Sequence, residues 1–148
     1  YSSAASDVYK RQVITWEKNN PPPNFSCRFF THSTETILWI RKGKKSKHYF
    51  NYDLMKSTNL NKQMKDVWLI GRPKKEELQF GKHPTQKPLE IIDRMLLSST
   101  KEGDLVVDMF CGSGSVLVSC KNNFRNGIGI ELEKDFYDLT LRRLENIK

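Results

Sequence analysis

Residues Asp108–Gly114 (DMFCGSG) combine an acidic side chain with a glycine-rich turn, directly after a short apolar run and before a helix-like segment. In open α/β sheets, ligands bind beyond the carboxyl ends of the strands, which places this turn at a binding crevice. Gly112 and Gly114 have no Cβ atom, so the backbone can turn tightly and approach a ligand closely. The amides that open the following helix suit a carboxylate. The segment therefore predicts a small-ligand site, with a turn shaped only by packing as the alternative.

A second acidic residue indicates which ligand this is. Glu131 lies nineteen residues after Gly112, at the end of the next predicted strand, where its carboxylate can accept hydrogen bonds from both hydroxyls of a ribose. The dinucleotide pattern would require a third glycine at position 117, but that residue is Leu117. Asp108 also suits an amino group better than a phosphate. S-adenosylmethionine has an amino group, a carboxylate and a ribose but no phosphate, so it fits better than a nicotinamide dinucleotide.

The loop Lys82–Pro88 (KHPTQKP) precedes the helix that leads into the glycine turn. It holds two prolines and several hydrogen-bonding side chains, and alone it would be a weak signal. Followed about twenty residues later by D-x-F-x-G-x-G, it is highly specific.

These paired motifs, followed by GIGIE at Gly127–Glu131, resemble the permuted (beta) class of DNA amino-methyltransferases, and residues 14–53 resemble its adenine-modifying restriction–modification members. The resemblance extends from Val13 to Lys148. It implies a Rossmann-like α/β fold, incomplete at the N-terminus, that transfers methyl from S-adenosylmethionine to the exocyclic amine of adenine in DNA. Met109 and Ser115 depart from the usual Pro and Thr. The residues implied to contact the cofactor are His83, Pro84, Thr85, Asp108, Phe110, Gly112, Ser113, Gly114 and Glu131.

The catalytic motif of that class, a D-P-P-Y-like tetrapeptide, does not occur in this sequence. The reaction depends on holding the target amine in line with the methyl sulfonium, so this motif is needed for turnover. Asn20–Pro23 (NPPP) is a poor substitute, because Pro23 has no aromatic face to stack on a base. We therefore expect no catalytic residue here, the true motif upstream, and no methyl transfer by these 148 residues alone.

Charge and composition favour a DNA partner. The chain has 25 Lys+Arg against 17 Asp+Glu, a formal net charge of +8, and a basic surplus suits the phosphate backbone. Five cations fall within seven residues, in a loop that either tracks phosphates or is simply solvated. The target base must leave the stack, so base flipping by the whole enzyme is expected. The residues expected to contact DNA are Arg41, Lys42, Lys44, Lys45 and Lys47.

Other features concern the setting of the protein. Cys27, Cys111 and Cys120 are widely spaced, which argues against a disulfide framework and fits a reducing cytoplasm. No apolar run is long enough for a membrane span, and the three histidines lack the spacing of a metal site. A homodimer and a functional link to a cognate restriction endonuclease are compatible with the sequence. Trp16, Trp39 and Trp68 each lie in an apolar run, which favours core packing over base stacking.

From residue 88 onward the pattern is helix, strand, helix, strand, helix, which predicts parallel strands with crossover helices. Helices are expected from Pro88, over Ser115–Asn122 and over Lys134–Ile147, the last with Tyr137, Leu141 and Leu144 on its apolar face. Buried strands are expected at Leu105–Val107 and Gly127–Glu131, and upstream at Val13–Trp16, Glu35–Ile40 and Asp66–Gly71. We expect residues 1–12 to be a non-native or disordered leader, residues 13–81 a partial catalytic segment with the target-recognition region, and residues 82–148 the cofactor-binding portion.

Three further readings remain. A cytosine exocyclic-amine methyltransferase shares these motifs. A nicotinamide-dependent oxidoreductase is disfavoured by Leu117 and by the KHPTQKP segment. A module that binds cofactor or DNA without turnover is the third.

Overall fold

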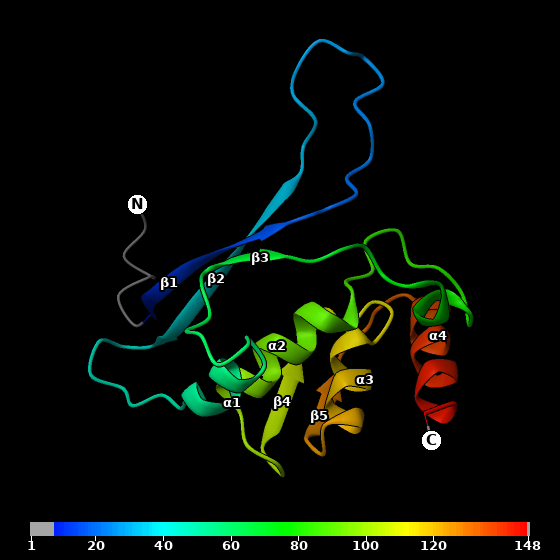
Figure 1. Ribbon diagram of the computed structural model, residues 1–148. Coiled ribbons are helices and arrows are strands. Elements are labelled where there is room, and N and C mark those ends of the chain that lie inside the picture. The colour runs from blue at the N-terminus through cyan, green and yellow to red at the C-terminus, as the bar shows by residue number, and fades with distance from the viewer. Residues whose placement is uncertain (1–7, 148) are drawn as a thin grey trace. The chain divides into compact units, whose positions relative to one another are not determined.

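A computed structural model describes Val8–Ile147, and it divides the chain into two compact units (Figure 1). The first unit comprises Tyr1–Tyr49 and Lys56–Gly71, and the second comprises Phe50–Met55 and Arg72–Lys148. The second unit resumes at Arg72, ten residues before Lys82, the expected start of the cofactor-binding portion. The short segment 50–55 also belongs with the second unit rather than the first. No helix in the described part of the chain is long and apolar enough to cross a membrane.

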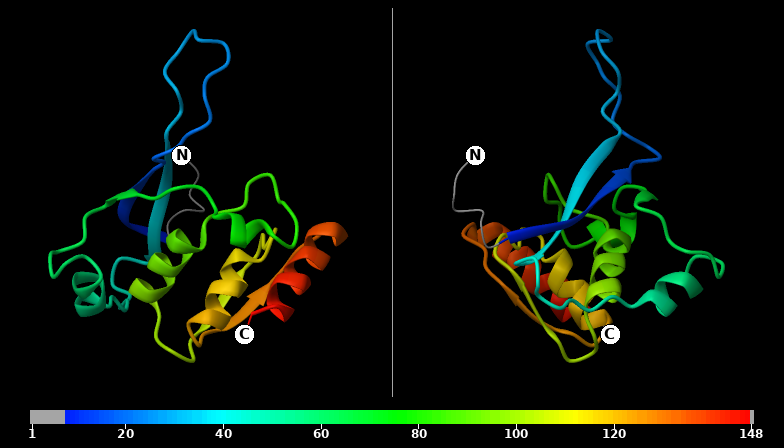
Figure 2. Two further views of the ribbon diagram at one scale, coloured as in Figure 1. Left: turned by 45° about the vertical axis from the view of Figure 1, so that its right-hand side comes forward. Right: turned by 90° about the vertical axis from the view of Figure 1, so that its left-hand side faces the viewer.

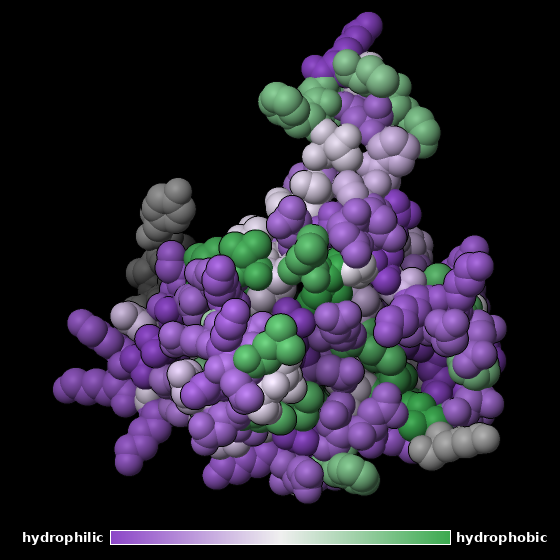
Figure 3. All heavy atoms as spheres, in the orientation of Figure 1, coloured by the Kyte–Doolittle hydropathy of each residue, from purple (hydrophilic) through white to green (hydrophobic). Residues whose placement is uncertain are grey.

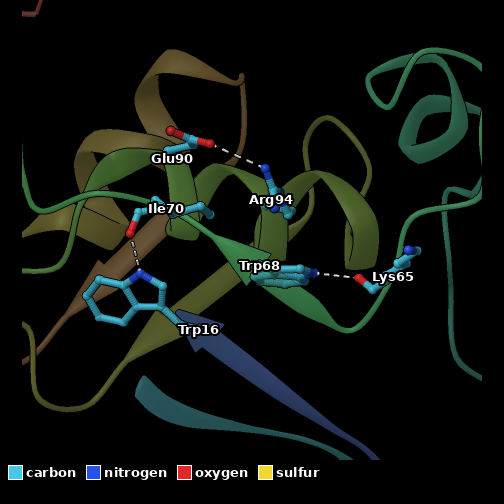
Figure 4. A network of polar contacts seen from close by, with 6 residues as sticks. All are labelled: Trp16, Lys65, Trp68, Ile70, Glu90 and Arg94. Carbon is cyan, nitrogen blue, oxygen red and sulfur yellow. Dashed lines mark hydrogen bonds and ion pairs between the residues drawn. The ribbon is translucent and has the colours of Figure 1, made fainter. Parts of the chain in front are cut away.

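The first unit is a three-stranded sheet. Strand β1 (Val8–Glu17) pairs antiparallel with β2 (Thr34–Lys42) and parallel with β3 (Val67–Leu69), giving the order β2-β1-β3. Its core contains Ile14, Trp16, Trp68 and Ile70. The indole Nε1 of Trp16 donates to the Ile70 carbonyl at 2.8 Å, and that of Trp68 donates to the Lys65 carbonyl at 2.9 Å (Figure 4). Core packing of these two tryptophans is therefore confirmed.

Two expectations for this unit need correction. Strand β1 begins at Val8, so residues 8–12 of the expected leader are paired strand rather than disorder, and residues 1–7 lie outside the described residues. Strand β2 forms where predicted but is not buried, because its side chains alternate between half-buried and exposed, as on an edge strand. Leu38 is 60 % exposed. The next residue, Trp39, is half-buried, and its ring meets that of His48 edge-on with centroids 5.6 Å apart.

The loop between β1 and β2 extends beyond the end of the hairpin (Figure 1) and has no regular structure around Pro21–Pro23, as the prolines predict. Asn24 organises it: the side-chain amide donates to the Phe29 carbonyl, and Oδ1 accepts from Ser26. Exposed apolar side chains gather on this loop (Figure 3). They are Phe25, Phe29 and Phe30.

The second unit is built around two parallel strands, β4 (Leu105–Asp108) and β5 (Asn126–Gly129). Helix α3 (Ser115–Asn122) connects them and packs on the sheet, and it also contacts α2 (Leu89–Ser99) and α4 (Lys134–Glu145) (Figure 2). The unit also contains α1 (Tyr52–Ser57), which overlaps the first unit, and a 3₁₀ turn, η2 (Lys75–Leu78). The predicted order of helices and strands from residue 88 is therefore confirmed, including the α/β fold class.

Helix α2 follows the sequence closely. It begins after Pro88, which lies at the N-cap, and its buried residues are Ile91, Ile92 and Leu96. Glu90 and Arg94 form an exposed ion pair one turn apart at 3.3 Å (Figure 4). Such a pair stabilises a helix by only about 0.3–0.5 kcal/mol, so burial of the apolar face is the main contribution.

Leu117, the residue that breaks the dinucleotide pattern, packs against β5. A Cβ on Gly127 or Gly129 would lie 2.7 Å from a Leu117 methyl carbon, so the strand is glycine-rich where the helix carries the bulk. In the dinucleotide pattern a helix glycine permits this close packing. Here the glycines lie on the strand and the bulky residue lies on the helix, so close packing does not require a glycine at position 117.

The burial of the strands was predicted wrongly. One face of β4 is exposed at Leu105 and Val107, and every residue of β5 is exposed, although both strands were expected to be covered. Strand β5 also ends at Gly129, before Glu131.

The face of α4 was predicted wrongly as well, because Tyr137 and Leu141 are exposed. The buried residues of this helix are Leu139, Thr140 and Arg143. Two of these three are polar, and periodicity of apolar residues cannot detect a buried face that carries polar side chains.

Candidate functional site

A pocket of about 180 Å³ opens where β4 meets α3, and all its lining residues belong to the second unit. One wall is the turn between β4 and α3, and the opposite wall is the loop that precedes α2. The two motifs singled out in the sequence therefore meet across one cavity. The lining residues are His83, Thr85, Gln86, Lys87, Ile92, Asp108, Phe110, Cys111, Gly112, Ser113, Ser115 and Val116.

The glycine turn needs its two glycines for different reasons. Gly112 has φ +54°, and a Cβ there would lie 3.2 Å from Nε2 of His83, so this backbone faces the histidine ring. Gly114 has φ +72° and forms the N-cap of α3, and a Cβ there would lie 2.5 Å from Thr140. Left-handed φ values favour glycine at both positions. The absence of side chains lets His83 approach one side of the turn and α4 the other.

His83 is held in place over the turn. Its ring packs against Phe136 with centroids 4.1 Å apart, and its Nδ1 accepts a hydrogen bond from the Thr85 amide at 3.2 Å. In the neutral ring an accepting Nδ1 puts the proton on Nε2, the nitrogen that faces Gly112. The ring thus presents a donor toward the pocket side of the turn.

Glu131 closes the outer edge of the turn. Its Oε2 accepts from the Gly112 amide at 2.6 Å, and its Oε1 accepts from the Glu133 amide at 2.9 Å. These backbone donors, first Glu133 and then Gly112, lower the pKa of the Glu131 carboxyl. The group is therefore an anion at neutral pH. Each carboxylate oxygen has two lone pairs, so both oxygens keep capacity for a further donor.

Helix α4 braces the turn from behind. Thr140 Oγ1 donates to the Gly112 carbonyl at 3.0 Å, and the buried Arg143 donates to the Ser113 carbonyl and to Ser115 Oγ. Burial lowers the pKa of the Arg143 guanidinium, and the negative charge of Glu77 opposes this shift. This brace could not be predicted from the sequence, since a basic residue in the last turn of a helix normally faces solvent.

Hydrogen bonds hold the loop before α2 to α3 on one side and to η2 on the other. Ser115 Oγ, which receives a hydrogen bond from Arg143, donates to the Lys87 carbonyl at 3.1 Å. Glu77 accepts from the Leu89 amide at 2.8 Å, and its carbonyl accepts from Gln86 Nε2 at 2.9 Å. The loop that forms this wall of the pocket is therefore positioned by hydrogen bonds between side chains and backbone groups.

Six of the nine predicted cofactor residues line the pocket, and three do not. Pro84 is exposed and Gly114 is buried under Thr140, and neither lines the pocket. Glu131 is not a lining residue but is bonded to Gly112, which is. The six predicted residues that line the pocket are His83, Thr85, Asp108, Phe110, Gly112 and Ser113.

Some lining residues were missed by sequence reasoning. Gln86 and Lys87 lie within the quoted motif and could have been included, whereas Ile92 of α2 lies within an ordinary helix pattern. Cys111 is buried, and burial raises the pKa of its thiol, which keeps it neutral.

The basic loop is placed in the first unit. Arg41 has a structural role: its guanidinium donates to the Ser46 carbonyl at 2.7 Å and lies 5.0 Å from the Tyr9 ring. The lysines of the run are exposed. They are Lys42, Lys44, Lys45 and Lys47.

Comparison with known proteins identifies this architecture. A family profile described as DNA methylase, for N6 and N4 methyltransferases, matches residues 3–142. The chain is 57 % identical over 133 residues to the type II methyltransferase M2.DpnII of Streptococcus pneumoniae, covering 89 % of this chain and 50 % of that protein. It is 53 % identical over 135 residues to M2.MboI of Moraxella bovis, covering 91 % of this chain and 50 % of that protein. The chain thus spans about half the length of these relatives.

Solved structures agree with the sequence comparison. The M1.HpyAVI–SAM complex superposes with a TM-score of 0.79 and 35 % identity, covering 95 % of this chain and 64 % of the other. The cytosine-N4-specific PvuII DNA methyltransferase has a TM-score of 0.78 at 18 % identity, covering 95 % and 54 %, and shows the shared fold. With two motif loops meeting across one pocket, a family match over most of the residues, and this structural likeness, the chain belongs to the DNA methylase family.

Proposed function

We propose that this chain forms the cofactor-binding part of a DNA methyltransferase that moves a methyl group from S-adenosylmethionine to the exocyclic amine of adenine. The observation that supports it most is the pocket itself, which joins the KHPTQKP loop to the glycine turn. The SAM complex of M1.HpyAVI, at 35 % identity, supports the choice of cofactor.

The residues present fit this cofactor. Glu131 is an anion with lone pairs left for two ribose hydroxyls, and Asp108 lines the pocket as a partner for an amino group. The bare backbone at Gly112 leaves room under His83 that a Cβ would narrow. S-adenosylmethionine supplies a methyl group activated on a sulfonium. The chain's own part is to bind and orient that group, since the tetrapeptide that would hold the target amine does not occur in this sequence.

The proposed DNA contacts are the exposed lysines Lys42, Lys44, Lys45 and Lys47. They are positioned by a turn that Arg41 closes from within, so Arg41 itself acts on the loop rather than on phosphate. A preformed turn that presents four exposed cations suits contacts to a duplex backbone, which position DNA without reading its sequence.

Adenine rather than cytosine is proposed because residues 14–53 resemble the adenine-modifying members of the class. The cytosine enzyme remains the second candidate, since the PvuII cytosine-N4 methyltransferase has the same fold. None of the residues that line the pocket distinguishes the two bases.

Isothermal titration of the 148-residue chain with S-adenosylmethionine, and separately with NADH, tests the proposal. We expect S-adenosylmethionine to bind and NADH to give no heat of binding. A tritiated-methyl assay on mixed-sequence DNA should show no transfer by this chain alone. Binding of NADH in preference to S-adenosylmethionine would refute the cofactor assignment, and robust turnover would show that the active site has been misplaced.

A further inference from the structure

Glu77 lies in η2, outside both sequence motifs, and its carboxylate joins two segments of the second unit. Its Oε1 accepts from the backbone amide of Lys74 at 3.2 Å, at the start of its own turn. Its Oε2 accepts from the backbone amide of Leu89 at 2.8 Å, at the start of α2. One side chain therefore fixes the position of η2 relative to the beginning of a helix twelve residues further along the chain.

The beginning of α2 needs a hydrogen-bond acceptor from elsewhere. The first amides of a helix have no partner within the helix, and the side chain at the N-cap normally accepts from one of them. Here the N-cap is Pro88, which makes no such side-chain bond. The Glu77 carboxylate takes over this task, and its negative charge also suits the positive end of the helix dipole. The start of α2 therefore depends on a residue of η2.

The chain that enters α2 is also held from the opposite side. Ser115 Oγ donates to the Lys87 carbonyl at 3.1 Å and accepts from the buried Arg143 at 3.2 Å. Lys87 and Ser115 both line the pocket, one from each wall. The segment is thus fixed at Lys87 by the wall that carries the glycine turn and at Leu89 by Glu77. Release of either contact leaves it held by only one of these two side chains.

We propose that Glu77 is a positioning residue for cofactor binding, whose carboxylate keeps the KHPTQKP loop in its ordered place opposite the glycine turn before a ligand arrives. Glu77 is not a lining residue of the pocket, so it acts through the loop and not by touching the ligand. Loss of the carboxylate lowers the fraction of molecules with an ordered loop, and the apparent affinity falls with that fraction. This assignment rests on the proposed cofactor.

Three substitutions separate the reach of the side chain from its charge. Glu77→Gln keeps an oxygen at the same reach but is neutral, Glu77→Asp keeps the charge but draws its oxygens back by one methylene group, and Glu77→Ala removes both. Thr100→Ala is the matched control, because Thr100 Oγ1 donates to the Leu96 carbonyl at 2.7 Å at the opposite end of the same helix, away from the pocket lining. Thermal melting of each variant reports on folding and on the stability lost.

Titration calorimetry with S-adenosylmethionine is the first measurement. We expect Glu77→Ala and Glu77→Asp to weaken binding about tenfold, as for loss of a hydrogen bond to a charged group. Glu77→Gln should retain the affinity of the unsubstituted chain, since its amide oxygen still reaches the Leu89 amide. Thr100→Ala should lower the melting temperature without changing the affinity.

Amide hydrogen exchange in the absence of any ligand is the second measurement. The backbone amides of Thr85 and Gln86 donate to Nδ1 and to the carbonyl of His83, so their exchange reports on the order of the loop. Both amides should exchange faster in Glu77→Ala than in the unsubstituted chain, and at an unchanged rate in Thr100→Ala.

Four results would overturn the assignment. An equal loss of affinity in Thr100→Ala would show that binding only follows the stability of α2. An equal loss in Glu77→Gln and Glu77→Ala would show that the oxygen facing Leu89 is not what matters. Unchanged affinity in a folded Glu77→Ala variant would exclude a positioning role and leave the proposed function intact. Failure of the unsubstituted chain to bind S-adenosylmethionine would overturn both.

Discussion

Replacement of Gly114 by alanine tests how tightly the glycine turn is held against α4. The substitution adds two separable costs. The first is the left-handed backbone, φ +72°, which costs an alanine about 1–2 kcal/mol. The second is crowding, because the new Cβ would lie 2.5 Å from Thr140 Cγ2 and 2.7 Å from its Oγ1, and overpacking of this kind costs about 1–3 kcal/mol. The free energy of unfolding should therefore fall by about 2–5 kcal/mol.

Gly103→Ala is the matched control for this change. Gly103 has a similar φ of +81°, but nothing lies within 4 Å of the Cβ that would be added, so only the backbone cost of about 1–2 kcal/mol applies. Urea unfolding followed by circular dichroism gives both values. We expect Gly114→Ala to be the more destabilising by about 1–3 kcal/mol, the crowding cost alone.

A third variant locates the crowding. Thr140→Ala removes the two atoms nearest the added methyl group, so the double variant should recover part of what Gly114→Ala loses. Thr140→Ala alone gives up the hydrogen bond to the Gly112 carbonyl and should cost about 0.5–1.5 kcal/mol. Equal costs for the two glycine substitutions, or simple additivity in the double variant, would refute the close approach of α4 to the turn.

Three further predictions follow from the site. Glu131→Gln should weaken S-adenosylmethionine at least about tenfold in calorimetry, by replacing an acceptor oxygen with a donor; an unchanged affinity would contradict a ribose contact. Backbone donation from Glu133 and Gly112 lowers the pKa of Glu131 below its ordinary 4.5, so its support of the turn is present above that value and is lost only as the pH falls through the lower folded-state pKa. The contribution of Glu131 to cofactor affinity, measured as the ratio of the affinities of the unsubstituted chain and the Glu131→Gln variant, should therefore be constant from about pH 8 to about pH 5. A fall in that ratio within this range would contradict the lowered pKa. Changing Lys44 and Lys45 to alanine should weaken binding to all DNA sequences alike and reduce the salt slope by about 1.8, measured by fluorescence anisotropy; sequence-selective loss would contradict the phosphate role.

The second unit was largely predictable from the sequence. The bounds of α3 are those predicted, and α2 begins after Pro88 as expected, because proline and glycine signals with apolar periodicity are local properties. The glycine turn was placed correctly for the same reason. The exposure of the neighbouring strands β4 and β5 was not predicted. Their apolar runs indicate strands that can be covered, but the sequence does not show whether this chain covers them.

Contacts between distant segments account for the rest. Arg143 and Thr140 hold the turn from α4, about thirty residues further along the chain, and no local pattern connects them to it. The position of the Gln86 side chain depends on where the Glu77 carbonyl lies, nine residues earlier in the chain. The structural role of Arg41 was hidden within a run of cations that all look alike in sequence.

A crystal structure of the 148-residue chain grown with S-adenosylhomocysteine would locate the cofactor site. We expect the adenosyl ligand in the pocket between His83 and the glycine turn, with its ribose hydroxyls within hydrogen-bonding distance of Glu131. A ligand bound elsewhere on the chain, or a ribose directed away from Glu131, would contradict it.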